Sequence, residues 1–426
     1  FTARQWTEHR LNPGQRQEGW INDLNGLIHY KGQWHLFAQR WAKCWLHAVS
    51  TDLVHWTELE PAFWEESDGS GVQSGTCVVD FDNTSGLSHD KAHPPMVAFW
   101  SRFDNQSQCI SYSLDDGKTW TRYEHNPTFI HPERDPKVFW YEPGKHWVMV
   151  MYGGEQYHVL TSTDLLHWND EHNPIPHSFE CPDIFELPLD GDATKMKWVL
   201  IQGNGNYSIG SFDGHKYTEE GERHRIDLGP NFYATQSWEN ARQKDRRRIQ
   251  AAWMQGSDFP DMPFNQQISF PCELTLHSTP AGPRIFRKPV HELSSIQGEP
   301  KVWKDVSLER GQIFPLVESG DLYRLVADVS IPEGASLEIN LRGDKVVLDS
   351  KRLQSGPARG EVQGSIHRIE ILLDRASIEA FANDGELSST RFFLPHFEGV
   401  SLHAVGGPVK VEKLTLWPLR SIWNPA

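Results

Sequence analysis

A short motif recurs along the first half of the chain at nearly even intervals, and it constrains the possible folds more than any other feature. The motif is a serine, an aspartate two residues later and a tryptophan a few residues beyond. It starts at Ser50, Ser113 and Ser162, and a weaker copy that ends in tyrosine starts at Ser211. The intervals are 63 (113−50), 49 (162−113) and 49 (211−162) residues. A repeat of roughly fifty residues, built from about four strands, is typical of a β-propeller blade. A common hairpin turn would explain any one copy, but four copies at this spacing favour the repeat.

The rest of the first three hundred residues agrees with an all-β fold. Short runs rich in Val, Ile, Trp and Tyr alternate with turns rich in Gly, Asp, Asn and Pro, and convincing helical periodicity is absent. About five units of the repeat length fit before residue 295. The sequence therefore predicts a β-propeller over residues 1–295.

A change of pattern follows the segment 297–300, whose Gly and Pro are typical of a linker. Residues 336–341 and 368–371 alternate cleanly between apolar and polar side chains, and Asn383-Asp384-Gly385 predicts a hairpin turn. The simplest interpretation is a second all-β domain over residues 300–426, a β-sandwich of two sheets.

The composition narrows the class of partner. Hydrophobic residues make up 38% of the chain and no apolar run approaches the eighteen or so residues of a membrane span, so we expect no membrane partner. The formal charge of −16 argues against nucleic acid, whose phosphates require clustered Lys and Arg. A neutral substrate such as a sugar fits better, because Trp and Tyr can stack on sugar rings and the chain has 18 Trp.

The cysteines and histidines give no sign of a metal site or a disulfide framework. The five cysteines are far apart, with no CxxC pair and no zinc-ligand spacing, and the 21 histidines include no HExxH motif. We therefore expect no cofactor and no metal ion.

The start of the chain bears on its location. It begins at Phe1 with neither an initiator Met nor a signal peptide, which indicates a processed or trimmed start. Asn83, Asn105 and Asn206 each begin a possible glycosylation triplet. These features favour a secreted over a cytoplasmic protein.

Three carboxylates occupy the same kind of position in distant parts of the chain. Asp23, Asp135 and Glu180 each lie in a turn with Pro or Gly, just before an apolar or aromatic strand. A propeller gathers the inner strand of each blade around one channel, so acids at the starts of three inner strands would face one another. Taken singly, Asp23 is also typical of an Asx turn and Asp135 of a surface turn.

The motifs around these acids resemble glycoside hydrolase family 32. Residues 20–26 are similar to its Trp-Met-Asn-Asp-Pro-Asn-Gly signature, and residues 134–136 and 180–182 match its two other hallmark motifs in the same order. Further similarity lies at residues 47–56, 72–76, 253–255 and 375–385. An ordered set of motifs is far more specific than any single triplet. Because these motifs lie between residues 20 and 385, the resemblance covers nearly the whole chain.

The resemblance implies a five-bladed propeller with a C-terminal β-sandwich, acting on β-fructosides by a retaining mechanism. It implies that Asp23 is the nucleophile, that Glu180 is the general acid/base and that Asp135 bonds sugar hydroxyls in the transition state. Asn22 and turn amides would keep Asp23 ionised. Arg134 would orient hydroxyls and keep Asp135 charged.

The resemblance also implies a fructose pocket. Gln39 matches a fructose-binding glutamine of the family, and Gln73 and Ser74, with Trp253, would complete the pocket. The family carries two tryptophans in the stretch that contains Trp41 and Trp45, although each of these could equally be a packing residue. The chain departs from the family pattern at Leu24, which replaces a proline, and in the short segment 39–45.

The leading hypothesis is a glycosidase that cleaves β-fructofuranosidic bonds in sucrose or in fructans of the inulin or levan type. A fructosyltransferase is the alternative within the class, and a carbohydrate-binding propeller without catalysis is the alternative outside it. A propeller glycosidase of another family, acting on arabinan or xylan, is disfavoured by the signature at residues 20–26.

Overall fold

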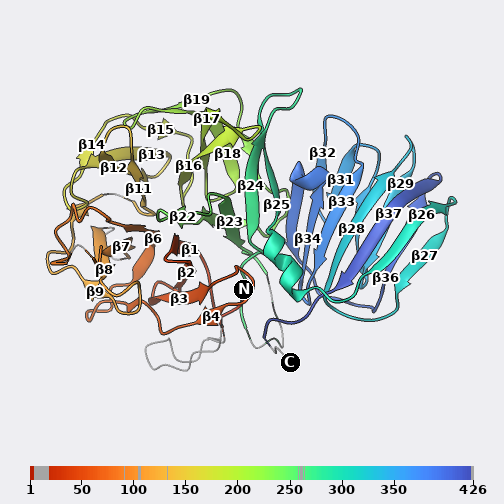
Figure 1. Cartoon of the computed structure of the whole chain (residues 1–426), viewed down its shortest axis with the longest axis horizontal. Helices are drawn as coiled ribbons and strands as arrows, with labels where there is room; N and C mark the ends of the chain where they lie inside the picture. Colours follow the sequence, from red (N-terminus) through yellow and green to blue (C-terminus); the bar gives the residue numbers. More distant parts are fainter. Residues whose placement is uncertain are drawn as a thin grey trace. The chain divides into compact units, whose positions relative to one another are not determined.

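The computed structural model describes residues 1–3, 19–90, 92–103, 107–131, 133–257, 259, 262 and 264–423. The possible glycosylation site at Asn105 lies outside them. The described residues form strands and two short 3-10 helices, η1 (His291–Ile296) and η2 (Asn383–Gly385) (Figure 1). Neither helix of this described chain has the length and hydropathy needed to cross a lipid bilayer. The expectation of an all-β fold is confirmed.

The chain divides into two compact units. The first contains Phe1–Pro188, Ala193–His224 and Tyr233–Pro271, and the second contains Leu189–Asp192, Arg225–Phe232 and Cys272–Ala426. Every residue that the sequence assigns to the site belongs to the first unit. The domain boundary expected at residues 295–300 stays a prediction.

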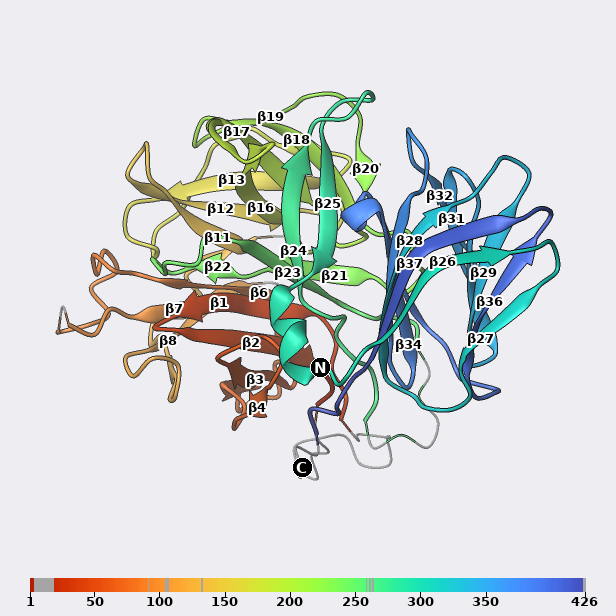
Figure 2. The ribbon, with the colours of Figure 1, turned by 45° about the vertical axis from the view of Figure 1, so that its right-hand side comes forward.

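The first blade of the propeller is an antiparallel sheet in which the first four strands pair in order and the fifth pairs with the third. Its strands are β1 (Leu24–Tyr30), β2 (Gln33–Arg40), β3 (Cys44–Ser50), β4 (Thr57–Glu58) and β5 (Phe63–Trp64). A short strand from much later in the chain, β22 (Glu239–Asn240), pairs in parallel with β1. Figure 2 shows β1, β2 and β3 side by side.

Three further blades of the propeller follow the same plan in chain order. The second has β6 (Val72–Val79), β7 (Met96–Arg102), β8 (Ser107–Ser113), β9 (Thr121–Arg122) and β10 (Phe129–Ile130). The third has β11 (Lys137–Tyr141), β12 (His146–Tyr152), β13 (Gln156–Ser162), β14 (Asn169–Asp170) and β15 (Ile175–Pro176). The fourth has β16 (Asp183–Leu189), β17 (Asp192–Ile201), β18 (Asn206–Phe212), β19 (Tyr217–Glu219) and β20 (His224–Arg225).

The remaining strands before the sandwich are β21 (Tyr233–Ser237) and β23 (Arg248–Trp253) of the first unit, and β24 (Cys272–His277) and β25 (Arg284–Pro289) of the second. β21 pairs with β23, and β24 pairs with β25. With them the described chain has the five blades that the repeat interval and the family resemblance predict.

The recurring motif marks the same point in the first four blades, at the end of the third strand. Asp52 Oδ1 accepts the backbone N–H of Val54 and of His55, and the Trp56 indole donates to the Leu53 carbonyl at 3.0 Å. The copies at Ser113 and Ser162 end in the same indole-to-backbone bond, also at 3.0 Å. The motif is therefore a hairpin turn, as the simpler interpretation held, and also a true structural repeat.

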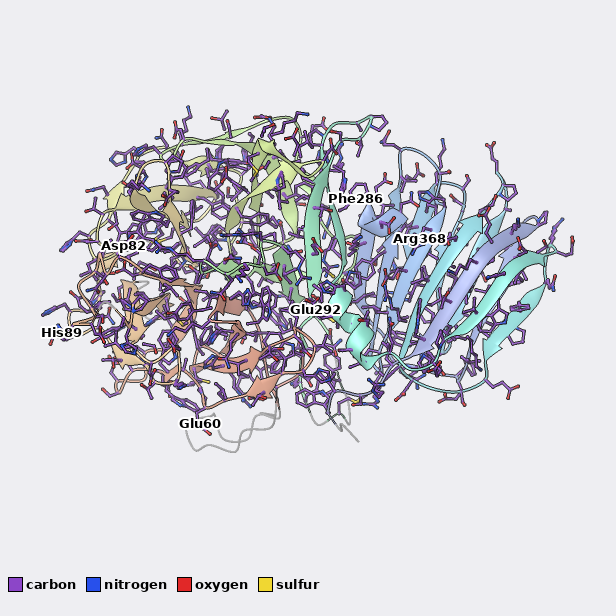
Figure 3. The ribbon with its side chains drawn as sticks, viewed as in Figure 1. Glu60, Asp82, His89, Phe286, Glu292 and Arg368 are labelled. Atoms are coloured by element: carbon purple, nitrogen blue, oxygen red, sulfur yellow. The ribbon has the colours of Figure 1, made fainter. Side chains whose placement is uncertain are left out.

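Apolar side chains from consecutive blades pack against one another. One cluster joins Val97 and Ile110 of the second blade to Val138, Met149 and Leu160 of the third. Polar side chains such as Glu60, Asp82 and His89 lie on the outer surface (Figure 3). Because the second and third blades are packed on both faces by their neighbours, their inner strands are held firmly enough to position a site.

The second unit contains a β-sandwich. One sheet has the order β26-β37-β28-β33-β34-β35 and the other has the order β27-β36-β29-β30-β31-β32. The strands are β26 (Lys301–Leu308), β27 (Ile313–Val317), β28 (Tyr323–Ser330), β29 (Ser336–Leu341), β30 (Asp344–Leu348), β31 (Arg352–Ser355), β32 (Ala358–Glu361), β33 (Arg368–Leu373), β34 (Ser377–Ala382), β35 (Leu387–Phe392), β36 (Val400–Val405) and β37 (Val409–Pro418). Their inward side chains form one core, and η2 makes the turn between β34 and β35 that the Asn-Asp-Gly sequence predicts. The sandwich expectation is confirmed.

Candidate active site

Asp23 lies directly before β1, and backbone and side-chain bonds fix its position. The Gln39 carbonyl accepts the Asn22 N–H at 3.0 Å, and the Asp23 carbonyl accepts the Gln39 N–H at 2.8 Å. Asn22 Oδ1 accepts the Trp20 indole N–H at 3.0 Å and the Trp41 backbone N–H at 3.1 Å. These bonds order the turn without the proline that Leu24 replaces.

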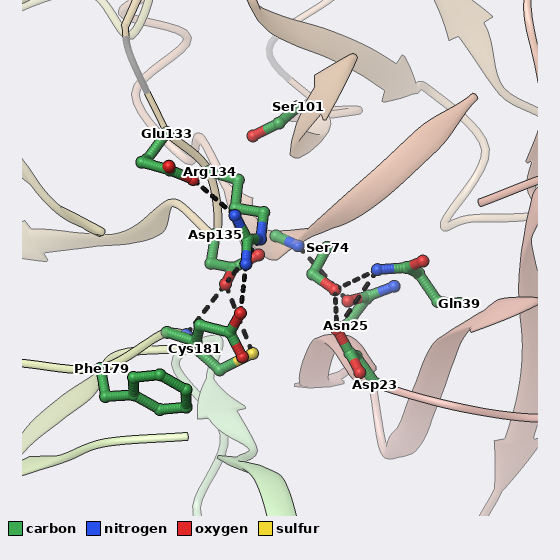
Figure 4. Close-up of polar contacts among 12 residues, drawn as sticks. Asp23, Asn25, Gln39, Ser74, Ser101, Glu133, Arg134, Asp135, Phe179 and Cys181 are labelled. Atoms are coloured by element: carbon green, nitrogen blue, oxygen red, sulfur yellow. Dashed lines mark hydrogen bonds and ion pairs between the residues drawn. The ribbon is translucent and has the colours of Figure 1, made fainter. Parts of the chain in front are cut away.

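The Asp23 carboxylate is held through one oxygen, Oδ2. Ser74 Oγ donates to it at 2.7 Å and Gln39 Nε2 lies 3.3 Å from it, while Gln39 Nε2 also donates to Ser74 Oγ at 2.5 Å (Figure 4). Burial raises the pKa of Asp23, the Ser74 bond lowers it, and the charge of Glu180 raises it. The net direction is upward, so burial outweighs the donors. Ser74 and Gln39 hold the carboxylate, and the side chain of Asn22, which the sequence also assigns to Asp23, lowers its pKa as well.

Asp135 lies two residues before β11 with a left-handed φ of 63°. Its Oδ2 accepts the Cys181 N–H at 3.0 Å, and the Cys181 thiol lies 3.5 Å from the same oxygen. Its Oδ1 is buried and has no hydrogen-bond partner. Burial, followed by the charge of Asp23, raises the pKa of Asp135 to about 7, although the Arg134 guanidinium, 3.9 Å away, lowers it. The expectation that Arg134 keeps Asp135 charged therefore needs correction, because burial outweighs the ion pair.

Glu180 lies three residues before β16, and each of its carboxylate oxygens has its own partner. Arg134 Nη2 pairs with Oε1, and the Tyr233 hydroxyl donates to Oε2. Glu180 also has a left-handed φ, of 38°. The Tyr157 hydroxyl donates to the Glu180 carbonyl at 2.7 Å, and the Gly203 N–H donates to the same carbonyl at 3.1 Å. These two bonds to its carbonyl fix the backbone of the turn that carries Glu180.

Tyr233 is not among the site residues predicted from the sequence, although a signal for it exists. Tyr233 is the first residue of β21, the inner strand of the fifth blade. The starts of the other four inner strands supply Asp23, Ser74, Asp135 and Glu180. The propeller rule that pointed to the acids would therefore have pointed to Tyr233 as well. Tyr157, which lies within β13, carries no such signal.

The three tryptophans expected at the pocket have different surroundings. Trp41 is partly exposed and stacks on Trp20, with ring centroids 5.1 Å apart. Trp253 is 9% exposed and meets Trp20 edge-on at 6.5 Å. Trp45 is fully buried, and its indole donates to the Gln73 carbonyl at 3.0 Å. Trp45 therefore supports Gln73 from behind and cannot itself contact a ligand, which corrects its expected place in the pocket.

The site thus brings together three carboxylates, one guanidinium and one phenol from different blades. Such a set can hold one carboxylate charged and another protonated, which is what general acid/base chemistry requires. Among the residues the structure describes, no three His, Cys, Asp or Glu side chains are grouped so as to hold a metal ion. Burial and the neighbouring carboxylates raise the pKa of the Cys181 thiol, so it acts here as a hydrogen-bond donor.

Comparison with known proteins gives a consistent result. The family model described as "Glycosyl hydrolases family 32 N-terminal domain" matches residues 14–289, and "Glycosyl hydrolases family 32 C terminal" matches residues 334–418. A levanase of Bacillus subtilis is 34% identical over 96% of this chain and 70% of its own length. An extracellular exo-inulinase of Aspergillus niger is 28% identical over 96% of this chain and 94% of its own.

Solved structures agree with the sequence comparison. The crystal structure of an exo-inulinase from Aspergillus awamori superimposes with a TM-score of 0.84 at 26% identity, and the match covers 96% of this chain and 97% of that one. The two family models together span most of the chain, in the order in which its propeller and its sandwich occur. The chain belongs to glycosyl hydrolase family 32 and is a β-fructofuranosidase-like glycosidase.

Proposed function

We propose that this protein hydrolyses β-fructofuranosidic bonds in sucrose or in fructans of the inulin or levan type, through a covalent fructosyl-enzyme intermediate. The observation that carries the proposal is the set of bonds on Asp23 and Glu180. One carboxylate is oriented by neutral donors, and the other is held between a guanidinium and a phenol. The names of the levanase and exo-inulinase relatives support the substrate class.

In the first step Asp23 attacks the anomeric carbon of the fructosyl unit. Ser74 and Gln39 both bond to Oδ2, which leaves Oδ1 as the oxygen that forms the bond to carbon. The electron pair of the breaking C–O bond moves to the leaving oxygen, which takes a proton from Glu180. In the second step Glu180 accepts a proton from water, and the hydroxyl displaces Asp23 at the same carbon with net retention. Retention requires the two carboxyl groups to lie about 5 to 5.5 Å apart.

Asp135 and Arg134 would bind and orient the fructosyl unit itself. The unpartnered, buried Oδ1 of Asp135 is an acceptor for a sugar hydroxyl, and leaving such an atom unpaired costs about 1–3 kcal/mol. A hydroxyl bond that strengthens as the oxocarbenium-like state forms lowers the barrier, because it stabilises that state more than the bound substrate. Arg134 touches Glu180 and lies close to Asp135, so it links the two.

The remaining assignments extend the same proposal. The propeller, over residues 1–295, would carry the catalysis, and residues 300–426 would form a separate sandwich domain. Asn22, Gln73 and Trp253 would line the fructose pocket with Gln39, Ser74 and Trp41. Secretion is supported by the word "extracellular" in the name of the exo-inulinase relative. Nucleic acid and membranes are not expected as partners, given the charge of −16.

A substrate panel tests the proposal. The purified protein is incubated with sucrose, inulin, levan, arabinan and xylan, and the released sugars are identified. Free fructose from at least one of the first three, with the first-formed anomer retained, is the expected result. Release of sugar only from arabinan or xylan, or inversion at the anomeric carbon, would contradict it. Glucose from sucrose in large excess over fructose would identify a transferase.

A further inference from the structure

Phe179, the residue directly before Glu180, has a ring that the fold covers only in part. Its side chain is 41% exposed, whereas most large apolar side chains of this chain are buried. Its ring meets Tyr152 at 6.2 Å and Tyr233 at 6.5 Å, with interplanar angles of 65° and 66°. An exposed phenylalanine contributes little to the stability of a monomer, so its position calls for another explanation.

The backbone of Phe179 is as firmly held as that of the acid beside it. The Tyr157 hydroxyl donates to its carbonyl at 3.1 Å, and the Gly203 N–H donates to the same carbonyl at 3.0 Å. The ring is therefore presented from a fixed turn, which lowers the backbone entropy lost when it contacts a ligand.

The position of the Phe179 ring indicates which sugar unit of the substrate it could contact. In Figure 4 the Phe179 ring lies across Asp135 and Cys181 from Asp23, Gln39 and Ser74. A general acid must lie within hydrogen-bond reach of the oxygen that it protonates, so the leaving sugar has to lie next to Glu180. With Asp23 as the nucleophile, the fructosyl unit would lie on the Asp23 side and the departing sugar on the Phe179 side.

From these observations we propose that Phe179 is the residue that contacts the leaving-group sugar and so sets the preference among leaving groups. The inference rests on the function proposed above, because it assumes that Glu180 protonates the leaving oxygen. The apolar face of a pyranose or furanose ring would cover the exposed aromatic ring. A stacking contact of about 0.5–1.5 kcal/mol corresponds to a change of roughly two- to tenfold in kcat/KM.

The test compares leaving groups of different size on the variants Phe179→Ala and Phe179→Leu. Three substrates are used: sucrose, an inulin-type trisaccharide and methyl β-fructofuranoside, whose leaving methanol has no ring to stack. We expect kcat/KM for the two saccharides to fall about tenfold in Phe179→Ala, mainly through KM. For the methyl fructoside it should stay within about twofold, and Phe179→Leu should fall between the wild type and Phe179→Ala.

The control is Phe397→Ala, which removes a more exposed phenylalanine (72% exposed) from the unit that holds none of the site residues. It should change none of the three values. Thermal unfolding of each variant verifies that it folds, and Phe179→Leu keeps the test valid if Phe179→Ala does not fold. An equal loss on all three substrates, or no loss on any, would overturn the inference while leaving the proposed function intact. A wild-type protein that cleaves none of the three fructosides would overturn both.

Discussion

Ser74 Oγ donates a 2.7 Å hydrogen bond to Asp23 Oδ2, although the two residues are 51 positions apart in the chain and belong to different blades. Burial and this bond act on the pKa of Asp23 in opposite directions. The bond therefore favours the ionised carboxylate, which is the form that can act as a nucleophile.

Ser74→Ala should raise the pKa of Asp23 and move the acidic limb of the pH–kcat/KM profile to higher pH. The activity at pH 5 should fall about tenfold or more, since a bond to a charged group contributes about 1.5–3 kcal/mol. Ser101→Ala is the matched control, because Ser101 is a buried serine whose hydroxyl donates at 2.7 Å to Gln108 and not to an acid. An acidic limb that stays in place in Ser74→Ala would show that the bond does not control Asp23.

Tyr233→Phe removes the hydroxyl that donates to Glu180. We expect kcat to fall about tenfold for sucrose and less for a fructoside with a good leaving group, because only the poor leaving group needs a proton in the first step. Tyr217→Phe is the control, since this buried hydroxyl bonds Ser208 at 3.0 Å, away from the carboxylates. Equal losses on both substrates would indicate that Tyr233 acts on binding instead.

Asp135→Asn should stabilise the fold at neutral pH. A carboxyl whose folded pKa is raised contributes stability that is present below its unfolded pKa and is lost as the pH rises through the folded pKa. The interval from 3.8 to about 7 corresponds to about 4 kcal/mol at about 1.4 kcal/mol per pH unit, as an upper figure. The free energy of unfolding of the variant, relative to the wild type, should therefore rise between pH 4 and pH 7 and then level off. Chemical denaturation at several pH values measures this difference in the free energy of unfolding. A difference that does not change with pH would show that the pKa of Asp135 is not raised in the folded protein.

Trp41 and Trp45 should respond differently to substitution. Trp41→Ala should change the ranking of sucrose, inulin and levan more than the rate on the best of them, because a partly exposed ring at the mouth can contact distal sugar units. Trp45→Ala should instead lower the free energy of unfolding by about 3–5 kcal/mol, as expected for a fully buried aromatic. Values of kcat/KM on the three substrates and unfolding curves separate the two. A uniform loss of activity in Trp41→Ala would assign it to packing or to the fructose alone.

Much of the fold was predictable because it follows from local patterns. The serine–aspartate–tryptophan motif recurs because the first three blades make the same turn after their third strands. The alternation in β29 likewise follows from one face of a sheet being buried. The acids were predictable because they share a position at the starts of inner strands.

The contacts between blades were not predictable from such patterns. That Tyr233 meets Glu180, or that Trp45 turns its indole to Gln73, depends on how separate sheets close around the channel. The pKa of Asp135 depends on the balance between burial and the Arg134 charge. The motif at residues 134–136 does not reveal that balance. Burial is a property of the assembled propeller.

The most direct test of the proposed mechanism is to trap the fructosyl-enzyme. In Glu180→Ala, a β-fructosyl substrate with a leaving group that needs no proton should react once and then accumulate as an ester, because no base activates water for the second step. Rapid quenching, proteolysis and mass spectrometry identify the modified peptide. The proposed mechanism predicts a fructosyl adduct on Asp23, which azide then removes as a fructosyl azide. An adduct on another residue, or release of the leaving group with no adduct at any time, would contradict Asp23 as the nucleophile.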